Sequence, residues 1–270
     1  MSNFSLKEFS RKPIPLWVSG PVIGAAILYG AFLIGDMHDL QEAVLTVRTE
    51  IGWPARPGDV PTQRLILAAE DGNRAAQARL GMIYMRGGGG LPQDVSKAID
   101  LWTRAAAAGD ARSQQMLGRT YAEGAKGIEK NPTFALQFTK LAADQGMSRA
   151  QADLARWTVH GEMGLASDVT EGLRLYKLAA DKGNVRALVD LGVLYQDGAL
   201  VAPDLAAAAD YYSKAIAQRN HPIALNNLGQ MHERGQGGLA VNKAEAIRLY
   251  KLAAALGNAD AQAALGKIAP

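Results

Sequence analysis

Residues 179–198 read AADKGNVRALVDLGVLYQDG, and this stretch decides the fold. Leu188, Leu191 and Tyr195 follow one another at the three- and four-residue spacing of an amphipathic helix face. Gly192 falls inside that helix, where glycine is about 1 kcal/mol less favourable than alanine. A glycine at this place needs a packing reason, and copies of the same stretch elsewhere in the chain indicate what that reason is.

The stretch recurs along the chain at a fixed interval of 37 residues. The position that opens each copy is occupied by Gly72, Gly109, Gly146, Gly183, Asn220 and Gly257. A Leu-Gly pair recurs in step at residues 80–81, 117–118, 191–192, 228–229 and 265–266, and the third copy has Leu154-Ala155 instead. Self-similarity at such a period indicates stacked units, each too small to bury its apolar face alone.

Each unit is predicted to be a helical hairpin, with a first helix such as 184–197 and a second helix such as 169–183. Side chains that can cap the second helices are Asp94, Asn131, Asp168, Asp204 and Asn242. The opening glycines should end the second helices in the left-handed conformation, and Asn220 should adopt it too. In the fourth unit the loop is one residue shorter and an extra residue near 217–220 restores the period.

The repeat offers a reason for Gly192. In a stacked array each first helix must lie close to the second helix of its own unit and to the neighbouring hairpins, so a side chain here would hold the backbones apart. The penalty in helix propensity is then offset by packing. Gly192→Leu should therefore destabilise the protein far more than Gly192→Ala.

The pattern AAxxGNxxAxxxLGxxYxxG followed by AxxLYKLAA resembles the Sel1-like repeat, a longer relative of the tetratricopeptide hairpin, over residues 62–270. The resemblance implies a right-handed α-solenoid that serves as an adaptor or scaffold, often in bacterial membrane-associated complexes and signalling, without catalytic activity. Ala155, Thr158, Asn220 and His232 depart from the family pattern. The predicted fold is all-α, with this solenoid preceded by a single transmembrane helix.

The predicted transmembrane helix covers residues 13–35, an uncharged run of 23 residues between Lys12 and Asp36. As a helix it would be roughly 34 Å long, enough to cross a hydrocarbon core of about 30 Å. A cleaved signal peptide is the alternative. The length of the run and the lack of an A-x-A-like site after it favour an uncleaved anchor.

Charges around this segment predict its orientation. Basic residues precede it and acidic residues follow it, so the tail 1–12 should stay cytoplasmic and the solenoid should lie in the periplasm of a bacterium, anchored in the inner membrane. Gly20 and Gly24 form a G-x-x-x-G pair that would let another transmembrane helix pack closely. Residues 36–61 should form an amphipathic helix that ends near Gly52, followed by an irregular, proline-containing linker.

Neither the composition nor the motifs indicate a catalytic site. The 270 residues contain no cysteine, which excludes disulfides and thiolate chemistry, and a net charge of +3 without basic runs does not indicate nucleic-acid binding. His38, His160, His221 and His232 show no metal-binding spacing. The run RGGGGLPQD lacks the ending of a phosphate-binding loop and is interpreted as a hairpin loop. No cofactor, metal or small-molecule substrate is expected.

A stripe three, six and ten residues after each opening glycine is interpreted as the solvent-facing side of the first helices. In the family the first helix tends to line a concave groove, so the resemblance implies an arginine-bearing channel through the middle units. The candidate partner-binding residues are Arg112, Arg119, Arg149, Arg156 and Arg186. Arginine favours carboxylate recognition, so the groove is hypothesised to hold an acidic or polar partner segment. An ordinary charged face is the alternative, and Asp153 and Asp190 are explained as solvated ion-pair partners of Arg149 and Arg186.

The sequence thus predicts a non-catalytic, membrane-anchored scaffold, an accessory subunit of a larger membrane protein complex that binds through the solenoid and the transmembrane helix. The alternative is a periplasmic regulator of a sensor kinase or envelope enzyme that binds reversibly. A third possibility, binding of cell-wall glycans, would require exposed aromatic platforms, and aromatic residues make up only 6% of the chain.

Overall fold

The computed structural model describes residues 59–268, with side chains from residue 62. The tail 1–12, the predicted transmembrane helix 13–35 and residues 36–58 lie outside the described residues. Within 59–268, no helix has the length and apolar character that crossing a bilayer requires. Regular structure in this range is helical apart from two isolated bridges, Gly88–Leu91 and Ala125–Ile128, which close hairpin loops.

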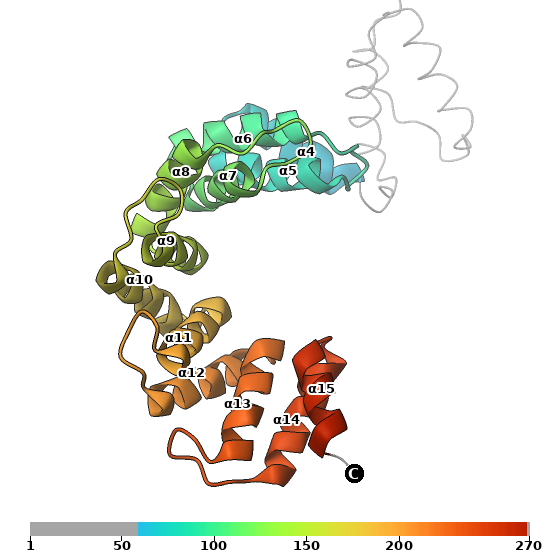
Figure 1. The fold of residues 1–270 in the computed structure, drawn as a ribbon. Helices are drawn as coiled ribbons and strands as arrows, with labels where there is room; N and C mark the ends of the chain where they lie inside the picture. The colour runs from blue at the N-terminus through green and yellow to red at the C-terminus, as the bar shows by residue number, and fades with distance from the viewer. Residues whose placement is uncertain (1–58, 269–270) are drawn as a thin grey trace, which may run out of the picture. The chain divides into compact units, whose positions relative to one another are not determined.

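The described part of the chain is a row of helical hairpins (Figure 1). The first helices are α5 (Arg74–Arg86), α7 (Ala111–Glu123), α9 (Ser148–His160), α11 (Val185–Asp197) and α13 (Pro222–Arg234). The second helices are α6 (Val95–Ala107), α8 (Pro132–Asp144), α10 (Val169–Asp181), α12 (Leu205–Gln218) and α14 (Lys243–Ala255). Each first helix packs against its own second helix, which packs against the next first helix. The predicted hairpins and their all-α solenoid are confirmed.

Two further helices flank the hairpins. α4 (Asp59–Glu70) precedes them and α15 (Ala259–Ile268) follows. α4 begins three residues before the predicted start of the solenoid, so residues 59–61 are helical where an irregular linker was expected. Pro61 does not prevent this, because it lies in the first turn of α4, where a missing N–H leaves no intrahelical bond unmade.

Capping of the second helices follows the prediction in all five hairpins. A side-chain oxygen accepts a hydrogen bond from the backbone N–H three residues later in each case, from Asp94, Asn131, Asp168, Asp204 and Asn242. These bonds satisfy donors that the first helical turn leaves without a partner. Helix starts are therefore fixed by the same residue position in every repeat.

The opening glycines close the second helices as predicted. At the end of α6, the Gly109 N–H donates to the Ala106 carbonyl and the Asp110 N–H donates to the Ala105 carbonyl, both at 2.9 Å. This pairing is the Schellman motif, which requires a left-handed residue, and Gly109 has φ 81°.

Asn220 does not follow this pattern, and the prediction for it was wrong. Among the described residues Met163 alone is a non-glycine residue with positive φ. α12 has one residue more than the other second helices, and its chain leaves through Arg219 in an extended conformation, with φ −163°. The extra residue changes the direction of exit, so no left-handed residue is needed at this junction.

Gly192 faces the second helix of its own hairpin. A Cβ atom at this position would lie 2.5 Å from Cε1 of Tyr212, a contact that requires the ring to move. Gly81 and Gly229 face Trp102 and Tyr250 in the same way. The predicted close approach is therefore confirmed, but the obstacle is a buried aromatic ring rather than the neighbouring backbone.

In the third hairpin the glycine lies on the second helix instead of the first. Four hairpins have glycine on the first helix and alanine four residues after the cap of the second helix. The third has Ala155 on α9 and Gly172 on α10. A Cβ at Gly172 would collide with Cγ2 of Val159 and lie 3.1 Å from the Ala155 carbonyl oxygen. The departure at Ala155 is thus compensated on the opposite helix, and packing is preserved.

Junctions between hairpins differ along the row. Five residues after the opening glycine, the first three hairpins carry a buried glutamine whose Nε2 donates to a carbonyl of the preceding helix. The pairs are Gln77–Ala69 at 3.0 Å, Gln114–Ala106 at 3.2 Å and Gln151–Ala143 at 3.2 Å. The fourth and fifth hairpins have buried Leu188 and Leu225 at this position.

Candidate binding groove

A groove of about 950 Å³ lies along the first helices of the second to fifth hairpins. Its walls come from α7, α9, α11, the α12–α13 junction and the end of α14. The lining residues used below are Arg119, Glu123, Arg149, Ala152, Asp153, Arg186, Val189, Asp190, Arg219, His221, Pro222, Ile223 and Leu256. We call this set the groove.

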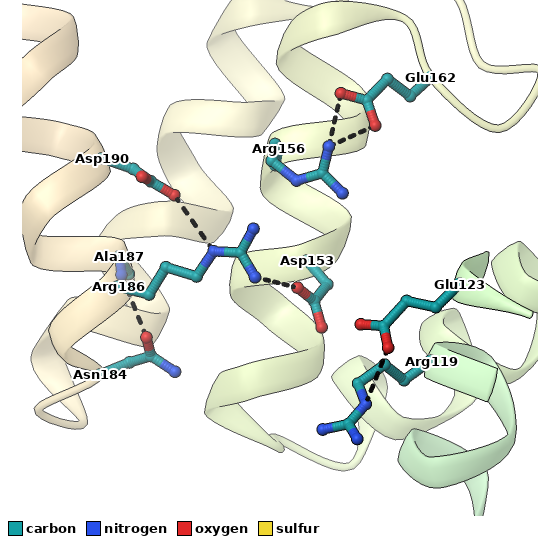
Figure 2. A network of polar contacts seen from close by, with 9 residues as sticks. All are labelled: Arg119, Glu123, Asp153, Arg156, Glu162, Asn184, Arg186, Ala187 and Asp190. Atoms are coloured by element: carbon teal, nitrogen blue, oxygen red, sulfur yellow. Dashed lines mark hydrogen bonds and ion pairs between the residues drawn. The ribbon is translucent and has the colours of Figure 1, made fainter. Parts of the chain in front are cut away.

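Three of the five candidate arginines line the groove, namely Arg119, Arg149 and Arg186. Arg112 is exposed on α7 but is not among the lining residues. Arg156 is directed to Glu162, with 2.6 Å between Nη1 and Oε1 (Figure 2). Partner binding by these residues stays a prediction, but their placement separates Arg112 and Arg156 from the other three.

The predicted solvent-facing stripe is only partly exposed. Its middle position, six residues after the opening glycine, is buried in all five hairpins, at Ala78, Gln115, Ala152, Val189 and Asn226. The interpretation of this position as solvent-facing was therefore wrong. Ala152 and Val189 form part of the floor of the groove.

Arg186 connects two hairpins across the groove. Its Nη1 lies 3.2 Å from Oδ1 of Asp153 on α9, and its Nε lies 4.0 Å from Oδ2 of Asp190 on α11 (Figure 2). The expected pairing of Asp153 with Arg149 is replaced by this link to the next hairpin. The view of both aspartates as solvated partners was wrong, because the Asp153 and Asp190 side chains are only 16% and 31% exposed.

Burial dominates the electrostatics of the two aspartates. It raises the pKa of Asp153 above its usual range, although Arg186 and Arg156 act in the opposite direction. Burial also raises the pKa of Asp190, against the effects of Arg186 and of a hydrogen bond with Tyr176. The two carboxyl groups thus hold protons more tightly than ordinary aspartates do.

The repeat pattern missed two groove residues as binding candidates. Arg219 and His221 lie at the α12–α13 junction, outside the repeated stripe. Burial lowers the pKa of His221, and Asp190 acts to raise it. The signal that could have found them is the extra residue in the fourth unit, because it alters how the chain enters α13.

The other histidines and loops have structural explanations. His160 is the last residue of α9, as predicted. Arg86 ends α5, and the four glycines after it lie in the hairpin loop between α5 and α6. His232 lies within α13, and its Nδ1 is buried. His38 lies outside the described residues. Within residues 59–268 no group of histidine, aspartate and glutamate side chains has the arrangement of a metal site.

Comparisons with known proteins place the repeat in context. The Sel1 repeat matches residues 74–110, 111–147, 148–184, 185–220 and 222–258. A protective antigen of uropathogenic Escherichia coli is 31% identical with a TM-score of 0.68, covering 76% of this chain and 43% of that one. A Sel1 repeat protein from Oxalobacter formigenes is 30% identical with a TM-score of 0.68, covering 77% and 58% respectively.

The chain therefore spans less than two thirds of the length of either relative. An immunity protein from Pseudomonas aeruginosa, 23% identical with a TM-score of 0.51 over 76% of this chain and 75% of that one, shares the fold. No curated protein matches the chain.

Proposed function

Because this chain belongs to the Sel1 repeat family, whose members are typically non-catalytic protein-binding scaffolds, we propose that it is a membrane-anchored scaffold and an accessory subunit of a larger membrane protein complex. Residues 13–35 would anchor the chain in the bacterial inner membrane, and residues 62–270 would bind partner proteins in the periplasm. The uncharged run and the charges on either side of it support this placement.

The observation that carries the proposal is the groove. It crosses four successive hairpins and presents arginine side chains from three of them and from the α12–α13 junction. Arginine guanidinium groups bind carboxylates through paired hydrogen bonds, and arginine is enriched at protein interfaces. We therefore propose that Arg119, Arg149 and Arg186 contact an acidic or polar segment of the partner.

The test is native mass analysis of the tagged full-length protein, extracted from its own membrane in mild detergent. A discrete assembly of fixed stoichiometry is expected. Arg149→Glu should remove partner protein from that assembly, whereas Arg112→Glu, a charge reversal outside the groove, should leave it intact. Equal effects of both variants would contradict the assignment of the groove as the binding surface.

The transmembrane segment gives a second readout. If the chain is a permanent subunit, Gly20→Leu with Gly24→Leu should lower the yield of the assembly, because the larger side chains prevent close helix packing. A monomer or homo-oligomer with partners below stoichiometry, unaffected by these changes, would instead indicate reversible regulation and overturn the subunit assignment.

A further inference from the structure

The groove has two chemically different ends. Toward α7 and α9 it is lined by charged side chains, including Arg119, Glu123 and Arg149. Toward α13 and α14 exposed apolar side chains join the lining beside Arg219 and His221, and Ile223 and Leu256 are 44% and 50% exposed there. Since the hairpins stack in chain order, these ends are separated along the length of the groove.

Charge compensation within the groove is uneven. Arg119 lies 3.6 Å from Glu123, and Arg186 lies between two aspartates. The side chains of Arg149 and Arg219 form no hydrogen bond or ion pair within residues 62–268, whereas the Arg219 backbone N–H donates to the Ala215 carbonyl. The positive charges left for a ligand are therefore those of Arg149 and Arg219, although both Arg119 and Arg186 also line the walls.

Two groove residues carry a polar atom without a hydrogen bond, although Nε of Arg186 lies 4.0 Å from one of them, Oδ2 of Asp190. Oδ2 of Asp190 and Nδ1 of His221 are buried without a hydrogen bond among the described residues. Because both atoms are covered by the protein itself, a ligand in the groove does not contact them, and its binding must come from the two ends. A segment that contacts both ends must be extended, because they lie on different hairpins, α7 and α9 at one end and α13 and α14 at the other.

From these features we infer that the groove binds an extended partner segment with a carboxylate side chain against Arg149 and a large apolar side chain against Ile223 and Leu256. The inference rests on the proposed function and names the chemistry of its partner. The charged end fixes the carboxylate, and the apolar end buries a side chain that would otherwise be exposed to water. The exposed side chains of Ile223 and Leu256 lie at one end only, and they give the segment its direction.

The experiment is selection of short random peptides on the full-length protein in detergent. Selected peptides should contain an acidic residue and a large apolar residue at a constant separation and in one order. Arg149→Glu should weaken their binding about tenfold or more and abolish the selection for the acidic residue. Leu256→Ser should abolish the selection for the apolar residue and keep that for the acidic one.

Arg112→Glu is the matched control, because it reverses a charge on α7 outside the groove, and it should leave both selections unchanged. Selected peptides without the acidic or the apolar preference, or absence of any selected peptide, would overturn the inference. The proposed scaffold function is judged separately by native mass analysis, so that function can stand when the peptide chemistry fails. If native mass analysis finds no discrete assembly while peptides with both preferences are still selected, the peptide chemistry is supported and the subunit function is contradicted.

Discussion

The first three hairpins and the last two have the same repeat but join their neighbours differently. In the glutamine hairpins, α5–α10, a buried amide donates to a carbonyl that also receives the N–H of the opening glycine. In the leucine hairpins, α11–α14, Leu188 and Leu225 fill the same position with apolar side chains. The register of a solenoid therefore does not require one kind of contact, because an amide that donates a hydrogen bond and an apolar side chain occupy the same position.

The groove lies across the boundary between these two regions. Its lining comes from the glutamine hairpins through α7 and α9, and from the leucine hairpins through α11 and α13. Arg186, on the first helix after the boundary, connects back to Asp153 on the last first helix before it. The ion pair between Arg186 and Asp153 thus connects the third and fourth hairpins, whose junction lacks the glutamine hydrogen bond.

The largest effect is expected from Gly192→Leu in the leucine hairpins. The new side chain must displace the buried Tyr212 ring, so the free energy of unfolding should fall by about 3 kcal/mol or more. Urea unfolding followed by circular dichroism measures the change. Gly266→Leu is the control, because a Cβ at this equivalent position of α15 meets no atom within 4 Å, and it should change stability by less than about 1 kcal/mol. Equal losses in both variants would refute the packing explanation.

A smaller effect is expected where the small residues are exchanged, in the last glutamine hairpin. Gly172→Ala raises helix propensity but places Cβ against Val159, so we expect destabilisation by about 1–3 kcal/mol. Val159→Ala in the same chain should recover part of that loss. A double-mutant cycle measures the coupling, and additive effects of the two changes would show that the collision with Val159 is not the cause.

A still smaller loss of stability is expected when a glutamine junction is replaced by a leucine junction. Gln114→Leu converts a glutamine junction to the leucine type. It removes the hydrogen bond to the Ala106 carbonyl and the one that Gln114 Oε1 accepts from Gln145 Nε2, so we expect a loss of about 1–2 kcal/mol. The Ala106 carbonyl keeps its bond from Gly109, which limits the loss. Thermal unfolding of this variant beside exposed Arg112→Leu provides the measurement. A gain in stability would mean that the apolar junction is intrinsically stronger.

The smallest effect is expected in the pH dependence of stability that Asp190 contributes, on the first helix after the boundary. Because burial raises the pKa of Asp190 in the folded state, the folded protein binds this proton more tightly than the unfolded chain does. This group therefore makes stability increase as pH falls from neutrality toward the ordinary aspartate pKa of about 4. Asp190→Asn should remove that contribution, while exposed Asp144→Asn should not. Urea midpoints between neutral and mildly acidic pH compare the two, and identical slopes would contradict the assignment.

Features that repeat could be predicted from the sequence, whereas those that depend on a single junction could not. The five caps of the second helices follow from one residue position, because a helix start is decided by its own first turn. The conformation of Asn220 does not, because the added residue in α12 changes the exit of the chain.

The same limit applies to the groove. The three lining arginines could be predicted from the stripe, but their pairing could not. Arg186 and Asp153 are 33 residues apart, and the ion pair forms because neighbouring hairpins bring α9 and α11 side by side. Arg219 lies outside the stripe and directly before Asn220. Whether an arginine has an acidic partner therefore depends on how the hairpins stack, and it cannot be read from the sequence of one repeat.

The exchange of Ala155 and Gly172 also bears on the order in which mutations could have accumulated. A Cβ added at Gly192 would meet the Tyr212 ring and one added at Gly172 would meet Val159, so alanine on both helices is obstructed, whereas glycine on both loses one buried methyl group and about 1 kcal/mol of helix propensity. From the arrangement of the other four hairpins, the exchange is therefore less costly when alanine is replaced by glycine first. The double-glycine intermediate can be made directly in the third hairpin as Ala155→Gly, and this variant should fold.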